Sequence, residues 1–322
     1  MPDQTQTGKA FEYALLQAFY ERLSPVTPTY IIDSAPYRTA LRCFELFGSV
    51  QQGAYRIVAS AAVNFLLDIE PRLSQATSEQ DTLQLDIVSD ARGQSGDVRD
   101  VLAIRRLQHW EIGISAKNNH RAVKHQRLSN TIDFGQKWMG VPCSRQYFDE
   151  IRPVFDSLDK LSRESLRRKT WASLGDYHPT VYIPILTAFR DELRRMEQAH
   201  GNIVAERLVQ YLIGNKDFYK VIKGNNSVEI QAYNINGTLN QPAGKVKPKA
   251  QLNRLRLPNR MIEVVFDGDS KTTLLVSLNE GWQIAFRIHN ASSRIEPSLK
   301  FDVNLVSAPH TLFTNHIFIG EV

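Results

Sequence analysis

Cysteine is scarce in this sequence of 322 residues, which contains only Cys43 and Cys143. They are far apart and belong to no CxxC or Cys/His cluster, so neither a disulfide framework nor a structural zinc site is expected. Long apolar runs are also missing, because the longest, 59–69, is interrupted by Asn64 and Asp68 and is too short to cross a bilayer. The amino terminus lacks the basic start and apolar core of a secretory signal. We therefore expect a cytoplasmic protein with reduced thiols and no membrane segment.

The composition is that of a globular protein with a mild excess of positive charge. Hydrophobic residues make up 42% of the chain, enough for one large core or two smaller ones. A net charge of +5 and a pI near 9.1 favour polyanionic partners, although many proteins with this balance never bind nucleic acid.

The spacing of apolar residues predicts an α/β protein with a mostly β carboxy-terminal region. Helices are expected at 8–23, 37–47, 55–66, 119–129, 144–158, 162–174, 183–199 and 204–213. Strands are expected at 83–88, in a hairpin between 96 and 117, and at 227–234, 260–266, 272–278, 282–289 and 299–306. The change in pattern at 214–226 predicts a helix-rich α/β part, residues 1–215, and a mainly β part, residues 216–322, that contributes to DNA binding.

The hairpin carries the most informative residues. Its strands, 96–104 and 110–117, alternate apolar and polar residues, with an acid near the start of the first and a lysine at the end of the second. If they pair antiparallel around the intervening turn, opposed residue numbers sum to roughly 215. Asp100 then lies opposite Ser115, and its carboxylate can approach the Lys117 ammonium.

An acid and a lysine at one sheet edge can serve phosphodiester hydrolysis, because together they can hold a divalent metal and stabilise a pentacovalent phosphorus. A solvated ion pair is the competing interpretation. Asp97 is a reserve acid, better explained as a turn or strand-start residue. Glu111 lies six residues from Lys117, roughly 20 Å along a strand, too far for the same metal.

Several blocks of sequence together carry a more specific signal. These blocks are Gly8 to Glu12, Gly96 to Val101, Ile114 to His120, Lys124 to Ser129, Ile132 to Gly135, Gln231 to Thr238, Phe286 to Ser293 and Glu296 to Asp302. With them the chain resembles, nearly end to end, a type II restriction endonuclease of the HaeIII family. The resemblance implies a restriction-endonuclease-like mixed sheet flanked by helices and a Mg²⁺-dependent PD-(D/E)xK core that cuts double-stranded DNA at GGCC. It also implies a cognate DNA methyltransferase as genetic partner.

In this pattern Asp100 takes the first acidic position and Lys117 the lysine position. The second carboxylate is missing, since Ser115 stands two residues before Lys117 and serine is a weak ligand for a hard cation. Glu12, on the first helix, is the better substitute, because several nucleases of this fold have a metal ligand there. The expected Mg²⁺ ligands are Asp100, Glu12 and the backbone carbonyl of Ala116, and the expected catalytic residues are Asp100, Lys117 and Glu12.

Basic residues in three regions are candidates for DNA contact. They are His120, Arg121, Lys124 and Arg127 on the expected helix 119–129, Lys245, Lys247, Lys249, Arg254 and Arg256 in a proline-punctuated loop, and Arg287. In each region a merely solvated surface is the alternative. No HExxH motif is present, and His289 with Asn290 is structural or DNA-contacting rather than part of an HNH nuclease.

Three functions stay open at this stage: a site-specific endonuclease, a nuclease of the same fold acting on branched or damaged DNA, and a DNA-binding protein without catalysis. The missing acid at Ser115 is the best argument for the last of these. A palindromic site is compatible with a homodimer or with a monomer that cuts the strands in turn.

Overall fold

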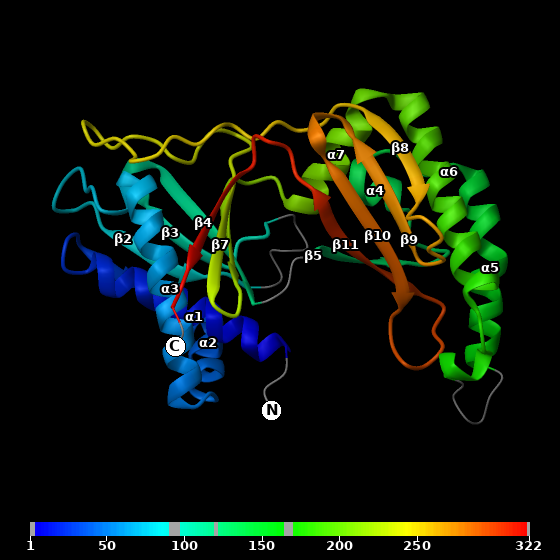
Figure 1. Ribbon diagram of the computed structural model, residues 1–322, viewed down its shortest axis with the longest axis horizontal. Helices are drawn as coiled ribbons and strands as arrows, with labels where there is room; N and C mark the ends of the chain where they lie inside the picture. The colour runs from blue at the N-terminus through cyan, green and yellow to red at the C-terminus, as the bar shows by residue number, and fades with distance from the viewer. Residues whose placement is uncertain (1–3, 90–96, 119–121, 164–169, 321–322) are drawn as a thin grey trace. The chain divides into compact units, whose positions relative to one another are not determined.

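The computed structural model describes residues 4–89, 97–118, 122–163 and 170–320, with the backbone alone at 4 and at 122–125. The chain forms two compact units (Figure 1). Unit 1 contains the described parts of 1–121, 215–255 and 311–322, and unit 2 those of 122–214 and 256–310. The contiguous division predicted at residues 215 and 216 differs from this interleaved grouping, because late strands of the chain join the sheets of both units.

Unit 1 is built on a seven-stranded mixed sheet in the order β1-β2-β3-β4-β6-β7-β12. The strands are β1 Thr29–Ile31, β2 Leu83–Ile87, β3 Val101–Arg105, β4 Trp110–Asn118, β6 Phe218–Lys223, β7 Ser227–Tyr233 and β12 Phe313–Phe318. The β1–β2 and β4–β6 pairs are parallel, and the other neighbours are antiparallel. The predicted mixed sheet with flanking helices is confirmed.

The helices of unit 1 are α1 Gln4–Leu23, α2 Ala35–Glu45 and α3 Ser49–Ile69. α1 packs on β2 and β4, and its residues Phe11, Leu15 and Phe19, which recur at helical spacing, are completely buried. Each buried side chain of this size stabilises the fold by about 2 kcal/mol relative to an exposed one. The packing places the first turns of α1 near the end of β4 that carries Lys117, as the contacts of Glu12 described below make clear.

Arg105, at the end of β3, links three loop segments of unit 1 by hydrogen bonds. Its fully buried guanidinium donates hydrogen bonds to the carbonyls of Arg72, Leu73 and Asp81 and to the Thr27 hydroxyl, at 2.6 to 3.0 Å. A buried charge of this kind is tolerated only when its donors are satisfied. Arg105 therefore anchors the end of the sheet where Leu83 of β2 pairs with Arg105 of β3.

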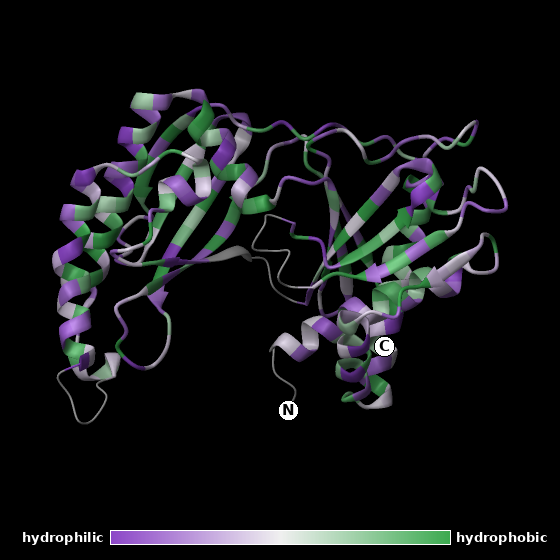
Figure 2. Ribbon diagram, turned by 180° about the vertical axis from the view of Figure 1, so that it is seen from behind, coloured by the Kyte–Doolittle hydropathy of each residue, from purple (hydrophilic) through white to green (hydrophobic). Residues whose placement is uncertain are grey.

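Unit 2 contains a five-stranded antiparallel sheet in the order β5-β11-β10-β9-β8. The strands are β5 Ala122–Leu128, β8 Met261–Phe266, β9 Thr273–Leu278, β10 Gln283–Asn290 and β11 Leu299–Ser307, and the helices are α4 Phe134–Met139, α5 Arg145–Arg163, α6 Ile183–His200 and α7 Asn202–Ile213. Hydrophobic and hydrophilic residues alternate along the strands (Figure 2), which is typical of a sheet with one buried face. No described helix in either unit is long and apolar enough to cross a membrane.

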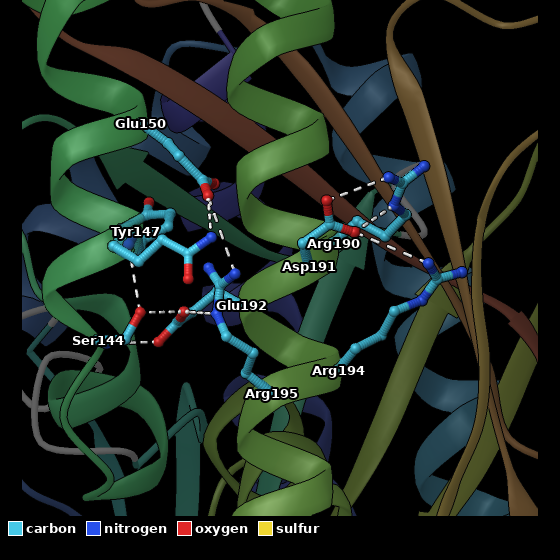
Figure 3. A network of polar contacts seen from close by, with 9 residues as sticks. Ser144, Tyr147, Glu150, Arg190, Asp191, Glu192, Arg194 and Arg195 are labelled. Carbon is cyan, nitrogen blue, oxygen red and sulfur yellow. Dashed lines mark hydrogen bonds and ion pairs between the residues drawn. The ribbon is translucent and has the colours of Figure 1, made fainter.

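A polar network joins α5 to α6 in unit 2 (Figure 3). The Glu192 carboxylate accepts hydrogen bonds from the Ser144 hydroxyl at 2.7 Å and from Arg195 Nε at 2.8 Å. The Ser144 oxygen in turn accepts from the Tyr147 amide at the start of α5. Because Ser144 satisfies an amide that the first turn leaves unpaired, it caps the helix while Glu192 holds the cap in place.

Two predicted helices are corrected by the structure. The segment expected as a helix at 119–129 forms the strand β5 from Ala122 onward, because its alternating side chains suit an edge that pairs with β11. In the segment 162–174, α5 ends at Arg163 and residues 171–174 form a 3₁₀ turn, with 164–169 outside the described residues.

Besides β5, the strands β1, β6 and β12 are absent from the sequence-based prediction. β6 lies within the predicted junction 214–226, and it is buried along almost its whole length as a parallel neighbour of β4. Such a strand shows no alternation of apolar and polar residues, so the periodicity that indicates other strands is absent. The consequence is that the central strand beside Lys117 could not be located from the sequence.

Candidate active site

The β3–β4 hairpin pairs in the predicted register. Val101 lies opposite Ile114, and the Asp100 amide donates a hydrogen bond of 2.8 Å to the Ile114 carbonyl. The sum of 215 for opposed residues is therefore confirmed. This register brings the Asp100 carboxylate beside the segment Ser115 to Lys117 of β4.

The Asp100 carboxylate is held by three donors. Its Oδ2 atom accepts hydrogen bonds from Lys117 Nζ at 3.1 Å, from the Ala116 amide at 2.7 Å and from the Ser115 hydroxyl at 3.3 Å. Within the described part of the chain all three of these bonds end on Oδ2, so Oδ1 stays open to a further ligand. The two side chains keep access to solvent, with 19% of Asp100 and 31% of Lys117 exposed.

Glu12 on α1 belongs to the same cluster. Its side chain is only 7% exposed and accepts a hydrogen bond of 3.0 Å from Lys9 Nζ, one helical turn earlier. Burial raises the pKa of Glu12 to about 8, and the negative charge of Asp100 adds to the rise, while Lys9 and Lys117 lower the pKa. Glu12 is thus close enough to Asp100 for the two carboxylates to repel each other.

Two neighbouring carboxylates fit a magnesium ion better than they fit a transition metal. Mg²⁺ binds through oxygen, usually to one or two carboxylates, and keeps several waters or substrate phosphates. In the part of the chain that the structure describes, no group of three or more His, Cys, Asp or Glu side chains gathers as a metal site. The donor set of Asp100, Glu12 and a backbone carbonyl is compatible with a cation whose remaining ligands come from water and substrate.

Asp97 and Glu111 have a different task, which is to hold Arg99. The Arg99 guanidinium donates to both Asp97 carboxylate oxygens at 2.7 and 2.8 Å and to Glu111 Oε1 at 2.8 Å. Its aliphatic stem lies against Gly113, where an added Cβ would come within 2.0 Å of the Arg99 Cδ atom. This arrangement explains the glycine in the middle of β4, and it braces the backbone next to Asp100.

Sequence reasoning missed Arg99 and Lys9 as supporting residues. The Lys9 and Glu12 pair could have been found, because a basic and an acidic residue three positions apart lie on the same side of a helix. Arg99 had a weaker signal, namely a glycine inside an otherwise apolar strand.

The described part of the expected basic helix 119–129 is the strand β5. His120 and Arg121 lie outside the described residues, and Lys124 is described only as a backbone position of β5 paired with Val303. Arg127 is 55% exposed on β5 and donates a 3.2 Å hydrogen bond to the Ser298 hydroxyl. The spacing that would align these residues on a helix has no such effect on a strand.

The basic tract 245–256 is divided between the two units. Lys245 and Lys247 are exposed, whereas Lys249 forms a 2.7 Å ion pair with Asp68. Arg254 donates a 2.8 Å hydrogen bond to the Ile235 carbonyl. Arg256, in unit 2, is 3.8 Å from Glu280, and Arg287 donates to Asp302 at 2.7 Å.

Glu70 anchors the segment around Asn240, which precedes the basic tract 245–256, to the rest of unit 1. The buried Glu70 Oε1 atom accepts hydrogen bonds of 2.6 Å from the Tyr219 hydroxyl and from the Asn240 amide. Burial raises the pKa of Glu70 to about 7, although both hydrogen bonds oppose the rise. Asn240 adopts a left-handed conformation with φ of 61° and donates to the carbonyls of Ile69 and Ala250.

A mixed sheet flanked by helices, with an acid entering β3 and a lysine near the end of β4, defines the class as a restriction-endonuclease-like α/β protein. Residues 8–309 match the family described as HaeIII restriction endonuclease. The chain is 36% identical over 307 residues to the type II restriction enzyme HaeIII of Haemophilus aegyptius, covering 95% of each protein. No solved structure matches. The chain belongs to the HaeIII restriction endonuclease family, which makes it a restriction endonuclease and a DNA-cleaving hydrolase.

Proposed function

We propose that this protein is a type II restriction endonuclease that hydrolyses phosphodiester bonds of double-stranded DNA at the palindrome GGCC with Mg²⁺. The observation that carries the proposal is the 3.1 Å contact between Asp100 and Lys117, with the buried Glu12 carboxylate in the same electrostatic cluster. The type II assignment is supported by the relative named above, and the GGCC site by the resemblance to the family.

In this proposal Asp100, Glu12 and the Ala116 carbonyl hold the cation. Bound there, Mg²⁺ would supply Lewis-acid polarisation of the scissile phosphate and a lowered pKa of a coordinated water. Asp100 can serve as a ligand through Oδ1 because its Oδ2 atom is already held by the Ala116 amide and by Lys117. Ser115 contributes by donating to Asp100 rather than by binding metal.

Lys117 has the role of a fixed positive charge. Its ammonium donates to Asp100 with one hydrogen and keeps two others, which can orient the attacking water or stabilise charge that develops on the phosphate oxygens. A lysine provides a compact charge that can be directed at a single oxygen, unlike the planar fork of arginine.

The raised pKa of Glu12 predicts a pH dependence. The carboxyl must lose its proton to bind a cation, so proton release accompanies metal binding. Because the pKa of Glu12 is about 8, the apparent affinity for Mg²⁺ rises with pH up to that value and then levels off.

For DNA contact we propose His120, Arg121, Lys124, Arg127 and Arg287 together with the loop residues Lys245, Lys247, Lys249, Arg254 and Arg256. Exposed lysines such as Lys245 and Lys247 suit phosphate contact, since they are not engaged in ion pairs within the described residues. The genetic partner is a DNA methyltransferase that modifies the same site. The enzyme acts as a monomer or as a homodimer, which sedimentation with and without a GGCC duplex distinguishes.

The test is digestion of plasmid DNA by wild-type protein with Mg²⁺, with EDTA, and by the Asp100→Asn variant. Wild type is expected to yield discrete fragments that end within GGCC, and Asp100→Asn to cleave about a thousandfold more slowly, as expected for loss of a group that acts in the transition state. Asp33→Asn, the same substitution at an exposed pair with Arg38 in unit 1, is the control and keeps full activity.

The same experiment separates the alternatives. A branched- or damaged-DNA nuclease would leave intact plasmid uncut or would cut without sequence-defined ends. A DNA-binding protein without catalysis, which Ser115 in place of a carboxylate favours, would bind the duplex and leave it whole in every condition. Cleavage that persists in EDTA or in Asp100→Asn would refute the assigned site.

A further inference from the structure

The sheet of unit 2 has one covered face and one open face. α4 and α6 cover the first, where Phe189 of α6 contacts Phe286 and Phe301 at ring distances of 5.4 and 4.9 Å. Tyr211 of α7 donates to Gln126 on the same side. The residues that alternate with these buried ones face away from the helices, and they include Arg127 of β5, Arg287 and His289 of β10, and Lys300 and Asp302 of β11.

Three basic side chains form one row across this open face. The strand register places Arg127 of β5 opposite Lys300 of β11, and Lys300 opposite His289 of β10. In the next row Arg287 lies opposite Asp302. Adjacent strands are about 4.8 Å apart, and cross-strand partners share a face, so the basic groups are direct neighbours.

Asp302 and Glu296 offset part of the positive charge in and beside this row. Asp302 is engaged by Arg287 Nη2 at 2.7 Å, with His289 Nε2 at 3.2 Å from its other oxygen. Glu296 is 3.8 Å from Arg127 and accepts a 2.7 Å hydrogen bond from Ser292. Within the residues that the structure describes, Lys300 forms no ion pair. Arg127 and Lys300 are like charges directly opposed on neighbouring strands, an arrangement that costs stability and that an anion lying across both would relieve.

We propose that the row Arg127, Lys300 and His289, with Arg287 beside it, binds the phosphate backbone of duplex DNA. The inference rests on the proposed function, because it takes DNA as the polyanion and assigns a second contact surface to it. Duplex DNA presents about one negative charge per 1.7 Å of its axis. A row of basic side chains therefore suits this polyanion better than it suits a single small anion. Three residues of the chain separate the end of β4, the strand of Lys117, from the start of β5, the strand of Arg127.

Phosphate contacts position a protein on DNA without reading the bases. The row is therefore expected to contribute equally to GGCC-containing and unrelated duplexes. Its contribution is also expected to weaken with salt, because each phosphate contact releases counterions. Lys300 gains a role that the sequence pattern did not assign to it, and His289 takes the DNA-contacting one of the two roles left open for it.

The experiment compares the double variant Arg127→Gln/Lys300→Gln with Arg145→Gln/Arg152→Gln in the full chain. The control pair removes the same charge from exposed positions of α5 in unit 2. Fluorescence anisotropy with a GGCC duplex and a scrambled duplex, in EDTA from 50 to 200 mM salt, measures binding. Arg127→Gln/Lys300→Gln is expected to bind both duplexes about tenfold more weakly near 100 mM salt, with a slope of log affinity against log salt reduced by about two.

An unchanged slope and affinity would overturn the inference, as would an equal loss in the control pair. The charge-conserving variant Arg127→Lys/Lys300→Arg keeps the wild-type salt slope if charge is what matters, and it covers the case in which the glutamine variant folds poorly. Plasmid digestion by wild-type protein is measured in parallel. A protein that binds DNA through this row but never cuts it would refute the proposed function and leave the contact surface standing.

Discussion

The interior of unit 1 and the open sheet face of unit 2 contain charged side chains in opposite environments. Unit 1 buries them and surrounds each with specific partners: Arg105 and Glu70 are completely inaccessible, and Glu12 and Arg99 are 5% exposed. The open sheet face of unit 2 leaves charges in solvent, with 55% of the Arg127 side chain and 58% of the Arg287 side chain exposed. Arginine and glutamate are thus buried and hydrogen-bonded around the sheet of unit 1, whereas arginines on the open sheet face of unit 2 remain in contact with solvent.

The difference follows from the dielectric environment. A buried charge has lost its hydration, so its pKa, its orientation and its partners are tightly determined by neighbouring groups. An exposed charge keeps its hydration and interacts weakly with protein groups, but it is free to meet a polyanion. Fixed geometry suits the chemistry we propose for unit 1, and accessible charge suits the DNA contact we propose for unit 2.

The largest expected effect is on Arg105→Met in unit 1. Removing the guanidinium leaves three carbonyls without their donor and takes away the cation that lies 3.6 Å from the buried Asp81 carboxylate, which is expected to lower the free energy of unfolding by about 3 to 5 kcal/mol. Hydrogen exchange read on peptides from β2 to β4 measures the loss within unit 1. Protection equal to wild type would show that burial in this unit does not make charges structurally essential.

Glu70→Gln is expected to change how stability depends on pH. Below the unfolded pKa of 4.5 the Glu70 carboxyl carries its proton in both the folded and the unfolded wild-type protein. In that range its titration does not change the free energy of unfolding. As pH rises toward 7 the unfolded chain loses the proton first, which destabilises the fold by about 3 kcal/mol once the pH exceeds the folded pKa.

Glutamine has no proton to lose, so thermal melts at pH 5 and pH 8 are expected to show the variant gaining on wild type as pH rises. Because Glu12 is unchanged in both proteins, its own titration cancels from the comparison. An equal difference between variant and wild type at both pH values would contradict the raised pKa of Glu70.

Glu12→Gln is expected to raise the Mg²⁺ concentration needed for half-maximal cleavage by at least about tenfold. Removing a group that only orients a metal ligand already weakens metal affinity by about tenfold. Glu12 is proposed as a ligand itself, so its loss is expected to cost at least as much. The variant is also expected to lose part of the rise in apparent affinity between pH 6 and pH 8. Glu21→Gln, on the exposed side of α1, serves as the control, and an identical Mg²⁺ requirement in Glu12→Gln and wild type would remove Glu12 from the site.

Arg287→Gln in unit 2 is expected to have the smallest effect on stability. The Arg287 and Asp302 pair is largely exposed on its arginine side, and such pairs contribute less than about 1 kcal/mol. Urea unfolding should therefore match wild type within this margin while duplex affinity falls. A stability loss comparable with that of Arg105→Met would erase the distinction between the two units.

The hairpin shows how far sequence reasoning reaches. Alternation within 96–117 and a short turn sufficed to pair Asp100 with Ser115, because antiparallel register follows from the turn position. The 36% identity to a curated restriction enzyme agrees with the family resemblance found in short blocks of sequence. Glu12 was chosen by analogy, and its burial near Asp100 became visible only in the structure.

The failures have equally specific causes. The segment 119–129 mixes apolar and basic residues so that helical and strand patterns both fit, and its pairing with β11, more than 170 residues away, decides for the strand. The buried strand β6 has no alternation to detect. The interleaving of the two units could not be predicted, since local patterns do not tell which strands share a sheet.

By itself the sequence determined most helices and the local hairpin that joins Asp100 to Lys117, because these depend on interactions between residues close together in the chain. It also determined the family, through short blocks of similar sequence. Only the tertiary structure decided which distant strands flank the site, that Arg99 engages Asp97 and Glu111, and that basic residues of β5, β10 and β11 meet in one row. These outcomes depend on burial and on pairing across long stretches of chain. Both are properties of the packed molecule rather than of any segment.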